Sequence, residues 1–183
     1  MLKIFYLLLI CLIFLICGQK QKPIAKSKPE PKPVAGFNIQ SPAFQDNAKI
    51  PDKFTGIGEN VSPQLSWTNP PAGMQSFALI MDDPDATRGT FTHWIIFDIP
   101  ANVSGLSEGV AQSEILSDSS RQLANGANRI GYTGPMPPPG KVHHYHFKLF
   151  ALDKKLGKIT QPIEKEMEGH ILGQTMLTGT YER

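Results

Sequence analysis

Residues 135–152 read Pro-Met-Pro-Pro-Pro-Gly-Lys-Val-His-His-Tyr-His-Phe-Lys-Leu-Phe-Ala-Leu, a proline corner that leads directly into a segment of β-strand composition. Prolines hold φ near −65° and lack an amide donor, so the corner is stiff and suits the wall of a binding pocket. Successive strand side chains point to opposite faces. We therefore expect His143 and Tyr145 to face the pocket, and His144 and His146 to lie on the opposite face.

Short β-type runs recur along the chain at residues 64–67, 77–81, 94–97 and 145–152. They are separated by turn formers such as those at 69–73 and 125–128, a pattern typical of all-β domains. The sequence thus predicts a mainly β fold, an antiparallel β sandwich.

One helix is expected, from about Pro162 to Gln174. Pro162 suits its first turn, and Glu164 and Glu166 favour its N-terminal end. Three apolar residues would share the face that docks on the sheet: Met167, Ile171 and Leu172.

The first 17 residues are predicted to be a signal peptide of the lipoprotein type. An apolar run from Ile4 to Ile16 follows Lys3 and ends at Cys17. The run is shorter than the ~20 residues that cross a bilayer as a helix, which favours a signal peptide. Cys17 would accept the lipid, although Ile16 stands where a small residue is usual. We expect an exported protein, periplasmic or cell-surface and anchored to a membrane. A secreted soluble form and an uncleaved short anchor are the alternatives.

Residues 18–36 are predicted to be a tether, because residues 19–36 hold five lysines, four prolines and one glutamate. Such a composition cannot bury a core and favours extended chain, with a reach on the order of 50 Å. Residues 37–183 remain as one domain. Cys11 and Cys17 are the only cysteines, so this domain has no disulfide or thiol chemistry. Its 12 basic and 15 acidic residues sum to −3, which speaks against a nucleic-acid surface.

A second candidate segment contains Asp83, Asp85 and His93. The two aspartates flank Pro84 directly after the apolar run 77–81, where an Asx turn is one interpretation. His93 alone would more often be a hydrogen-bonded core histidine. A calcium loop starting at Asp83 is excluded, because an arginine and a tryptophan stand where the invariant glycine and glutamate belong. A pair formed by His144 and His146 lacks a third metal ligand. We therefore predict no metal and no cofactor.

Residues 105–109 match the Gly-x-Ser-x-Gly pattern of a nucleophile elbow, with Asp118 and His143 following in hydrolase order. That motif requires a sharp strand-to-helix turn in a parallel α/β sheet, which the surrounding sequence does not predict. A hydrolase using Ser107 is accordingly the third hypothesis, and we do not expect an enzyme.

Seven segments, taken in order, resemble the phosphatidylethanolamine-binding protein family, in its bacterial branch often labelled Raf-kinase-inhibitor-like. They cover nearly all of the expected domain: residues 50–55, 60–67, 83–86, 93–94, 134–138, 143–145 and 177–181. The resemblance implies a β sandwich with Greek-key connections and few peripheral helices, including the one near the C-terminus. This chain departs from the family's usual residues at Thr87, where proline is common, and at His144, where arginine is frequent.

The resemblance also implies a small pocket for phosphate-like and carboxylate anions, including phospholipid head groups. Carried over by position, the ligand-binding residues are Asp83, Asp85, His93, Gly134, Pro135, His143 and Tyr145. We expect donors from His93, Tyr145 and the amide of a turn centred on Gly134. Asp83 would orient an imidazole or meet an ammonium group.

The first function hypothesis is therefore noncovalent binding of a small anionic or zwitterionic ligand by a membrane-tethered domain. If a pocket histidine must be protonated, affinity should fall as the pH rises from about 6 to about 8. The alternative is a protein-interaction module of the protease- or kinase-inhibitor type, with a partner that the sequence does not identify.

Overall fold

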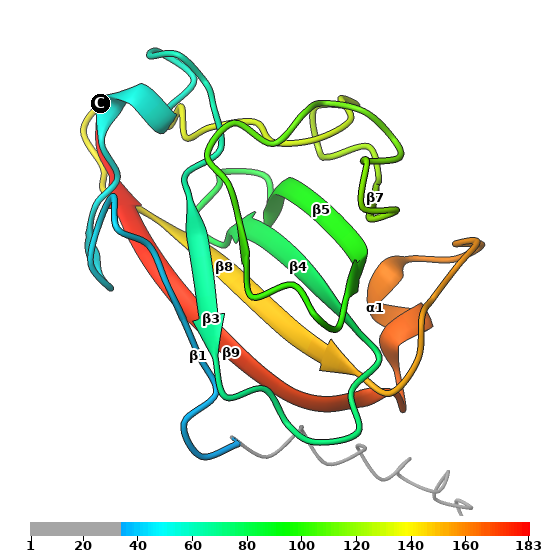
Figure 1. Ribbon diagram of the computed structural model, residues 1–183. Helices are drawn as coiled ribbons and strands as arrows, with labels where there is room; N and C mark the ends of the chain where they lie inside the picture. Colours follow the sequence, from blue (N-terminus) through cyan, green and yellow to red (C-terminus); the bar gives the residue numbers. More distant parts are fainter. Residues whose placement is uncertain (1–33) are drawn as a thin grey trace, which may run out of the picture.

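A computed structural model describes residues 34–183 (Figure 1). The predicted signal peptide with Cys17, and residues 18–33 of the predicted tether, lie outside the described residues. The strands are β1 (Asn38–Gln40), β2 (Ala48–Lys49), β3 (Leu65–Thr68), β4 (Ser76–Asp83), β5 (Phe91–Pro100), β6 (Gly105–Leu106), β7 (Arg121–Gln122), β8 (His143–Leu152) and β9 (Ile171–Tyr181). A 3-10 turn, η1 (Asp52–Phe54), and one helix, α1 (Ile163–Met167), complete the described elements.

The strands form two sheets, with the order β1-β3-β6 in the smaller and β2-β9-β8-β4-β5-β7 in the larger. All pairings are antiparallel except that of β2 with β9. Consecutive strands pair in β4–β5 and in β8–β9, with α1 in the connection between β8 and β9. The two pairs are joined by the central pairing of β4 with β8, two strands that are distant in sequence. The prediction of a mainly β sandwich with few helices is confirmed.

The main core lies between the two sheets. The Trp67 ring of the small sheet packs on Phe77 of the large sheet, with ring centroids 5.2 Å apart. A second apolar cluster covers the outer face of the large sheet, where Ile163 and Met167 of α1 pack with Ile80 and Phe97. Because apolar layers cover both of its faces, β4 is buried along all its length.

The predicted helix over 162–174 is correct only for its first turns. Helix α1 ends at Met167, Gly169 adopts a positive φ of 91°, and β9 begins at Ile171. Ile171 pairs with Leu152 of β8. The apolar spacing fitted a helix as well as a strand, and pairing with a long neighbouring strand outweighed weak local propensity.

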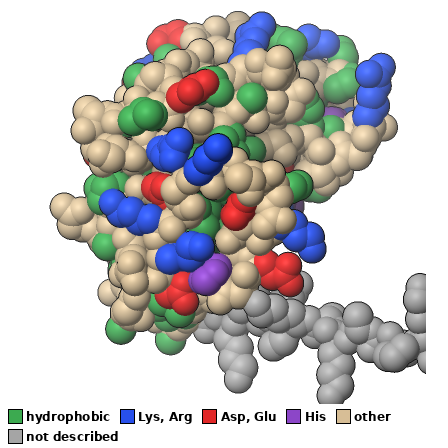
Figure 2. All heavy atoms as spheres, turned by 90° about the vertical axis from the view of Figure 1, so that its right-hand side faces the viewer, with side chains coloured by type: hydrophobic (Ala, Val, Ile, Leu, Met, Phe, Trp, Pro, Cys, Tyr) green, Lys and Arg blue, Asp and Glu red, His purple; other side chains and the backbone are tan. Residues whose placement is uncertain are grey.

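The domain starts to pack slightly before the predicted boundary at residue 37. Val34 contacts the main core, and the amide of Phe37 donates to the Val34 carbonyl at 3.1 Å. Within residues 34–183, no helix is long and apolar enough to cross a membrane. On the face that carries α1, basic and acidic side chains are interspersed (Figure 2).

Candidate functional site

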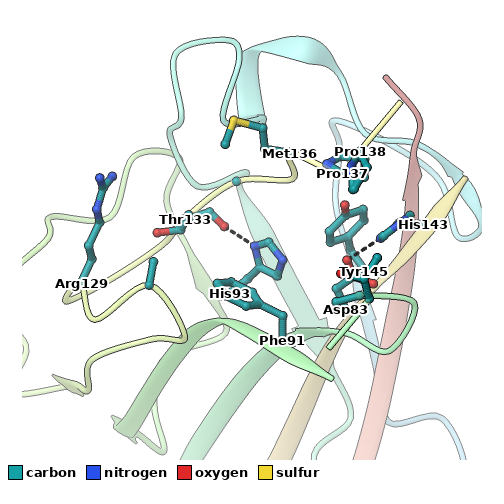
Figure 3. Close-up of a pocket in the computed structure, with 14 residues that line it drawn as sticks. Asp83, Phe91, His93, Arg129, Thr133, Met136, Pro137, Pro138, His143 and Tyr145 are labelled. Atoms are coloured by element: carbon teal, nitrogen blue, oxygen red, sulfur yellow. Dashed lines mark hydrogen bonds and ion pairs between the residues drawn. The ribbon is translucent and has the colours of Figure 1, made fainter. Parts of the chain in front are cut away.

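A cavity of about 320 Å³ opens where β4 ends and where β5 and β8 begin. The strand ends supply Asp83, His93, His143 and Tyr145, and the loop before β8 supplies the opposite wall (Figure 3). That wall consists of Ala127, Arg129, Thr133, Gly134, Met136, Pro137 and Pro138. Five of the seven predicted ligand-binding residues line this cavity, whereas Asp85 and Pro135 do not. The β4–β5 and β4–β8 pairings thus bring together residues 83–93 and 134–145, which are far apart in sequence.

His143 is held by Asp83 at the base of the pocket. The Nδ1 atom of His143 lies 2.7 Å from Oδ2 of Asp83, and both side chains are almost fully buried. The other carboxylate oxygen of Asp83 accepts the Asp85 amide at 2.8 Å. Since a carboxylate accepts, Nδ1 carries the proton, and Nε2 of His143 has no hydrogen-bond partner among the described residues.

His93 is held in a similar way by a main-chain carbonyl. Its Nδ1 lies 2.7 Å from the oxygen of Thr133, which can only accept, so Nδ1 is the protonated nitrogen. Burial lowers the pKa of His93 below its usual 6.5, against the opposing effects of the Thr133 hydrogen bond and the nearby Asp83. His93 is therefore neutral at pH 7, and its Nε2 is an acceptor. The expectation that His93 donates to an anion applies only to its protonated form.

The ring of Tyr145 lies between the two histidines. Its centroid is 5.2 Å from that of His93 and 6.5 Å from that of His143. The hydroxyl is buried and has no partner among residues 34–183. Burial, followed by the charges of Asp83 and Asp85, raises the pKa of Tyr145, so the phenol remains a donor. An unmade hydrogen bond at a buried hydroxyl costs about 1–3 kcal/mol, which an incoming acceptor would recover.

Gly134 and Pro135 support the loop and do not offer donors to the pocket. The Gly134 amide donates to Oδ1 of Asn60 at 2.7 Å, so it cannot be the donor that was expected from a turn centred on this residue. The Pro135 carbonyl accepts the Gly56 amide at 2.8 Å. A Cβ atom at Gly134 would overlap the Phe54 carbonyl oxygen. Only glycine allows this close approach of two backbone segments.

Asp85 lies beside the pocket and fixes the start of β8. Its Oδ2 accepts the His144 ring Nδ1 at 2.7 Å and the His144 amide at 3.0 Å. These bonds, with a smaller contribution from Lys141, lower the pKa of Asp85 to about 2. His144 is exposed on the outer side, as the alternation of the strand predicts.

His146 also faces outward, with Nδ1 3.7 Å from Oδ1 of Asp82. Lys148 donates to the other oxygen of that carboxylate at 2.6 Å. Across the described part of the chain, no group of three or more metal-ligating side chains gathers.

Asn125 organises the pocket loop, a role that the sequence reading missed. Its amide nitrogen donates to the His93 carbonyl at 3.2 Å, to the Gly131 carbonyl at 3.0 Å and to Oγ1 of Thr133 at 2.8 Å. Its oxygen accepts the amides of Ala127 at 2.9 Å and Arg129 at 3.2 Å. The only signal in the sequence was an Asn-Gly pair, which indicates a turn without showing that the asparagine is buried.

Phe91 and Arg129 are among the lining residues that were not predicted as site residues. Phe91 packs its ring edge on His93 at 4.7 Å between centroids, which limits rotation of the imidazole. Arg129 is exposed at the pocket wall and forms no ion pair with any residue that the structure describes. Its guanidinium places a positive charge beside the cavity.

Ser107 lies outside this pocket, on an exposed loop that follows β6. The chain after it forms turns and bends up to β7, so the strand-to-helix elbow is not present. Asp118, the residue expected in hydrolase order, uses Oδ1 to accept the Ser120 amide at 2.9 Å. The local structure therefore does not support a nucleophilic role for Ser107.

The sequence is similar to a known protein family and to curated relatives. A family model described as phosphatidylethanolamine-binding protein matches residues 40–182. A UPF0098 protein of Methanothermobacter thermautotrophicus is 45% identical over 151 residues, covering 80% of this chain and 99% of the relative. A UPF0098 protein of Aquifex aeolicus is 40% identical over 153 residues, covering 80% of this chain and 89% of the relative.

Solved structures show the same similarity. The structure of a homologue from Chlamydia trachomatis, described by the same family name, superposes with a TM-score of 0.74 at 33% identity, covering 82% of this chain and 99% of that one. Escherichia coli YbcL superposes with a TM-score of 0.73 at 28% identity, covering 81% of this chain and 99% of that one.

Proposed function

The chain belongs to the phosphatidylethanolamine-binding protein family, and from this premise we propose that its pocket binds a small anionic or zwitterionic ligand without covalent chemistry. The ligand would be phosphate-like or a phospholipid head group. One observation carries the proposal: three polar groups with no partner among the described residues, Tyr145 Oη and the Nε2 atoms of His93 and His143, belong to side chains that line one cavity.

The electrostatics of the pocket suit an anion that is partly shielded from water. Arg129 provides an unpaired positive charge at the wall, and Tyr145 provides a buried donor. The positions of His93 and His143 are set by their Nδ1 hydrogen bonds, so binding requires little side-chain ordering. A few hydrogen bonds to a small solvated ion leave about 4–7 kcal/mol, which corresponds to a Kd on the order of 10 μM to 1 mM.

The first prediction compares two histidine variants of the full-length chain. His93→Ala should weaken binding of phosphate or phosphoethanolamine by about 10- to 150-fold, because it removes a hydrogen bond to a charged ligand. His144→Ala should leave the affinity nearly unchanged, since His144 is exposed and bonded to Asp85. NMR or calorimetric titration measures both, and melting curves verify that each variant is folded. Equal affinities for the two variants would remove His93 from the site.

A second candidate function is a protein-interaction module, which exposed apolar side chains beside the pocket favour. Met136, on the pocket wall, is 58% exposed, and Val142, next to His143, is 42% exposed. Such side chains suit contacts with a peptide that places an acidic group in the cavity. A wild-type spectrum that millimolar phosphate and phosphoethanolamine leave unchanged would place this candidate first.

We further propose that the protein is exported and held at a membrane by a lipid on Cys17, with the lysine- and proline-rich segment as a spacer. The support is the short apolar run that ends at Cys17. Cys17→Ser should release the protein from the membrane fraction or leave its precursor unprocessed. Cys11→Ser is the matched control and should do neither. Identical membrane fractionation of wild type and Cys17→Ser would contradict lipidation and leave export untouched.

A further inference from the structure

We infer that the pocket discriminates between phosphate groups by their protons, and that it prefers a phosphomonoester or free phosphate, which can carry a P–OH group, to a phosphodiester, which cannot. The inference rests on the proposed function, because it concerns the ligand of the same cavity. Its basis is the tautomer of His93 that the surrounding main chain imposes.

The Thr133 carbonyl determines which nitrogen of His93 carries the proton, and therefore which nitrogen can present a lone pair to a ligand. A carbonyl oxygen at 2.7 Å from Nδ1 requires the proton on Nδ1, so in the neutral ring Nε2 can only accept. Thr133 cannot change this role, because its neighbour Gly134 is tied to Asn60 and its own hydroxyl is bonded by Asn125. In Figure 3 the His93 ring stands beside that of Tyr145, with the ring centroids 5.2 Å apart.

The other polar groups around the cavity supply the complementary contacts. Tyr145 presents a donor, and His143, paired with Asp83, can present Nε2 either as an acceptor or, when protonated, as a donor. The charged and titratable groups that act on His93 are Asp82, Asp83 and His143, and Arg129 lines the opposite wall. A ligand that forms a hydrogen bond with neutral His93 must therefore supply the donor group itself.

Phosphomonoesters and phosphodiesters differ in whether they can carry a P–OH donor. A phosphomonoester has a second pKa near 6, so close to neutral pH a substantial fraction is a monoanion with one P–OH donor and several acceptor oxygens. That form can donate to Nε2 of His93 and accept from Tyr145. A simple diester offers only acceptors, so its oxygen would face the lone pair of His93 unless the buried ring were protonated.

Burial opposes that protonation, since it lowers the pKa of His93. A diester must therefore overcome the cost of charging a desolvated imidazole, whereas a monoester monoanion need not. The affinity for a monoester should fall as the pH rises above its second pKa, because the P–OH donor is then lost. The midpoint of this fall should follow the ligand, moving to higher pH for methylphosphonate, whose second pKa is higher than that of methyl phosphate.

The test is a titration of the full-length chain at pH 6 with methyl phosphate and with dimethyl phosphate, which carries no N–H or O–H donor. We expect methyl phosphate to bind about 10-fold more tightly or better, the effect of one hydrogen bond to a charged group. ¹⁵N NMR of the histidine rings should show His93 still neutral, with its proton on Nδ1, in the methyl phosphate complex. In His93→Phe, which keeps a ring but removes the acceptor, the preference should shrink toward unity.

The outcomes separate the two levels of the proposal. Binding of dimethyl phosphate as tight as that of methyl phosphate, or a His93 imidazolium in the methyl phosphate complex, would overturn the proton preference and leave anion binding standing. Failure of both ligands and of inorganic phosphate to bind at millimolar concentration would overturn the proposed function itself. If His93→Phe does not fold, the wild-type ratio and the ¹⁵N shifts still decide.

Discussion

Asn125→Asp should lower the free energy of unfolding by about 3 kcal/mol or more, although it replaces one atom. The Asn125 amide donates to two carbonyls, of His93 and Gly131, and to the Thr133 hydroxyl. A carboxylate cannot donate, so buried acceptors lose their partner and face a negative charge, at about 1–3 kcal/mol for each unsatisfied group. Urea or guanidinium unfolding of the full-length chain measures the change.

Asn128→Asp is the matched control for this variant. Asn128 belongs to the same turn but is exposed, and no side-chain hydrogen bond of it is found among the described residues. Its φ of 57° is in the left-handed region, which aspartate tolerates. We expect a change within about 0.5 kcal/mol. Similar losses in the two variants would mean that the Asn125 network does not support the loop.

Gly134→Ala should destabilise the domain by about 3 kcal/mol, the upper part of the range for overpacking. The added methyl group would overlap the Phe54 carbonyl oxygen and lie 2.8 Å from Cα of Thr55, all backbone atoms. Neither side can yield easily, because the Gly134 amide is bonded to Asn60 and the Pro135 carbonyl to Gly56. Ligand affinity should fall as well, since the same loop holds Thr133 against His93.

Gly140→Ala is the control that separates this steric overlap from the conformational cost of replacing a glycine. Gly140 ends the proline corner with a φ of 88°, and a Cβ there would meet nothing within 4 Å. Its replacement should cost only about 1–2 kcal/mol, the price of a left-handed conformation for alanine. Thermal and denaturant unfolding of both variants gives the comparison. A Gly134→Ala protein as stable as Gly140→Ala would show that the loop can move away from Phe54.

The fold could be predicted from the sequence where a segment's own pattern decided its conformation. The runs assigned to β3, β4, β5 and β8 are rich in β-branched, aromatic and aliphatic residues and are bounded by turn formers, so local chemistry and burial agree. Strand β9 escaped prediction because its residues also fitted a helix. Its ladder with β8, from Leu152 to His143, exists only once the chain has folded.

The same division applies to the candidate site. Strand alternation places His143 and Tyr145 on one face and His144 on the other, which depends only on their spacing. Asp83 and His93 were expected from the resemblance of the motifs that contain them, and both line the cavity.

Only the tertiary structure decided the chemistry at each atom. Thr133 makes Nε2 of His93 an acceptor, Asn60 occupies the Gly134 amide, and Asn125 is buried as the centre of a loop. Each depends on a hydrogen-bond partner from another part of the chain. A sequence determines which groups can donate or accept, whereas the folded chain determines which of them remain free for a ligand.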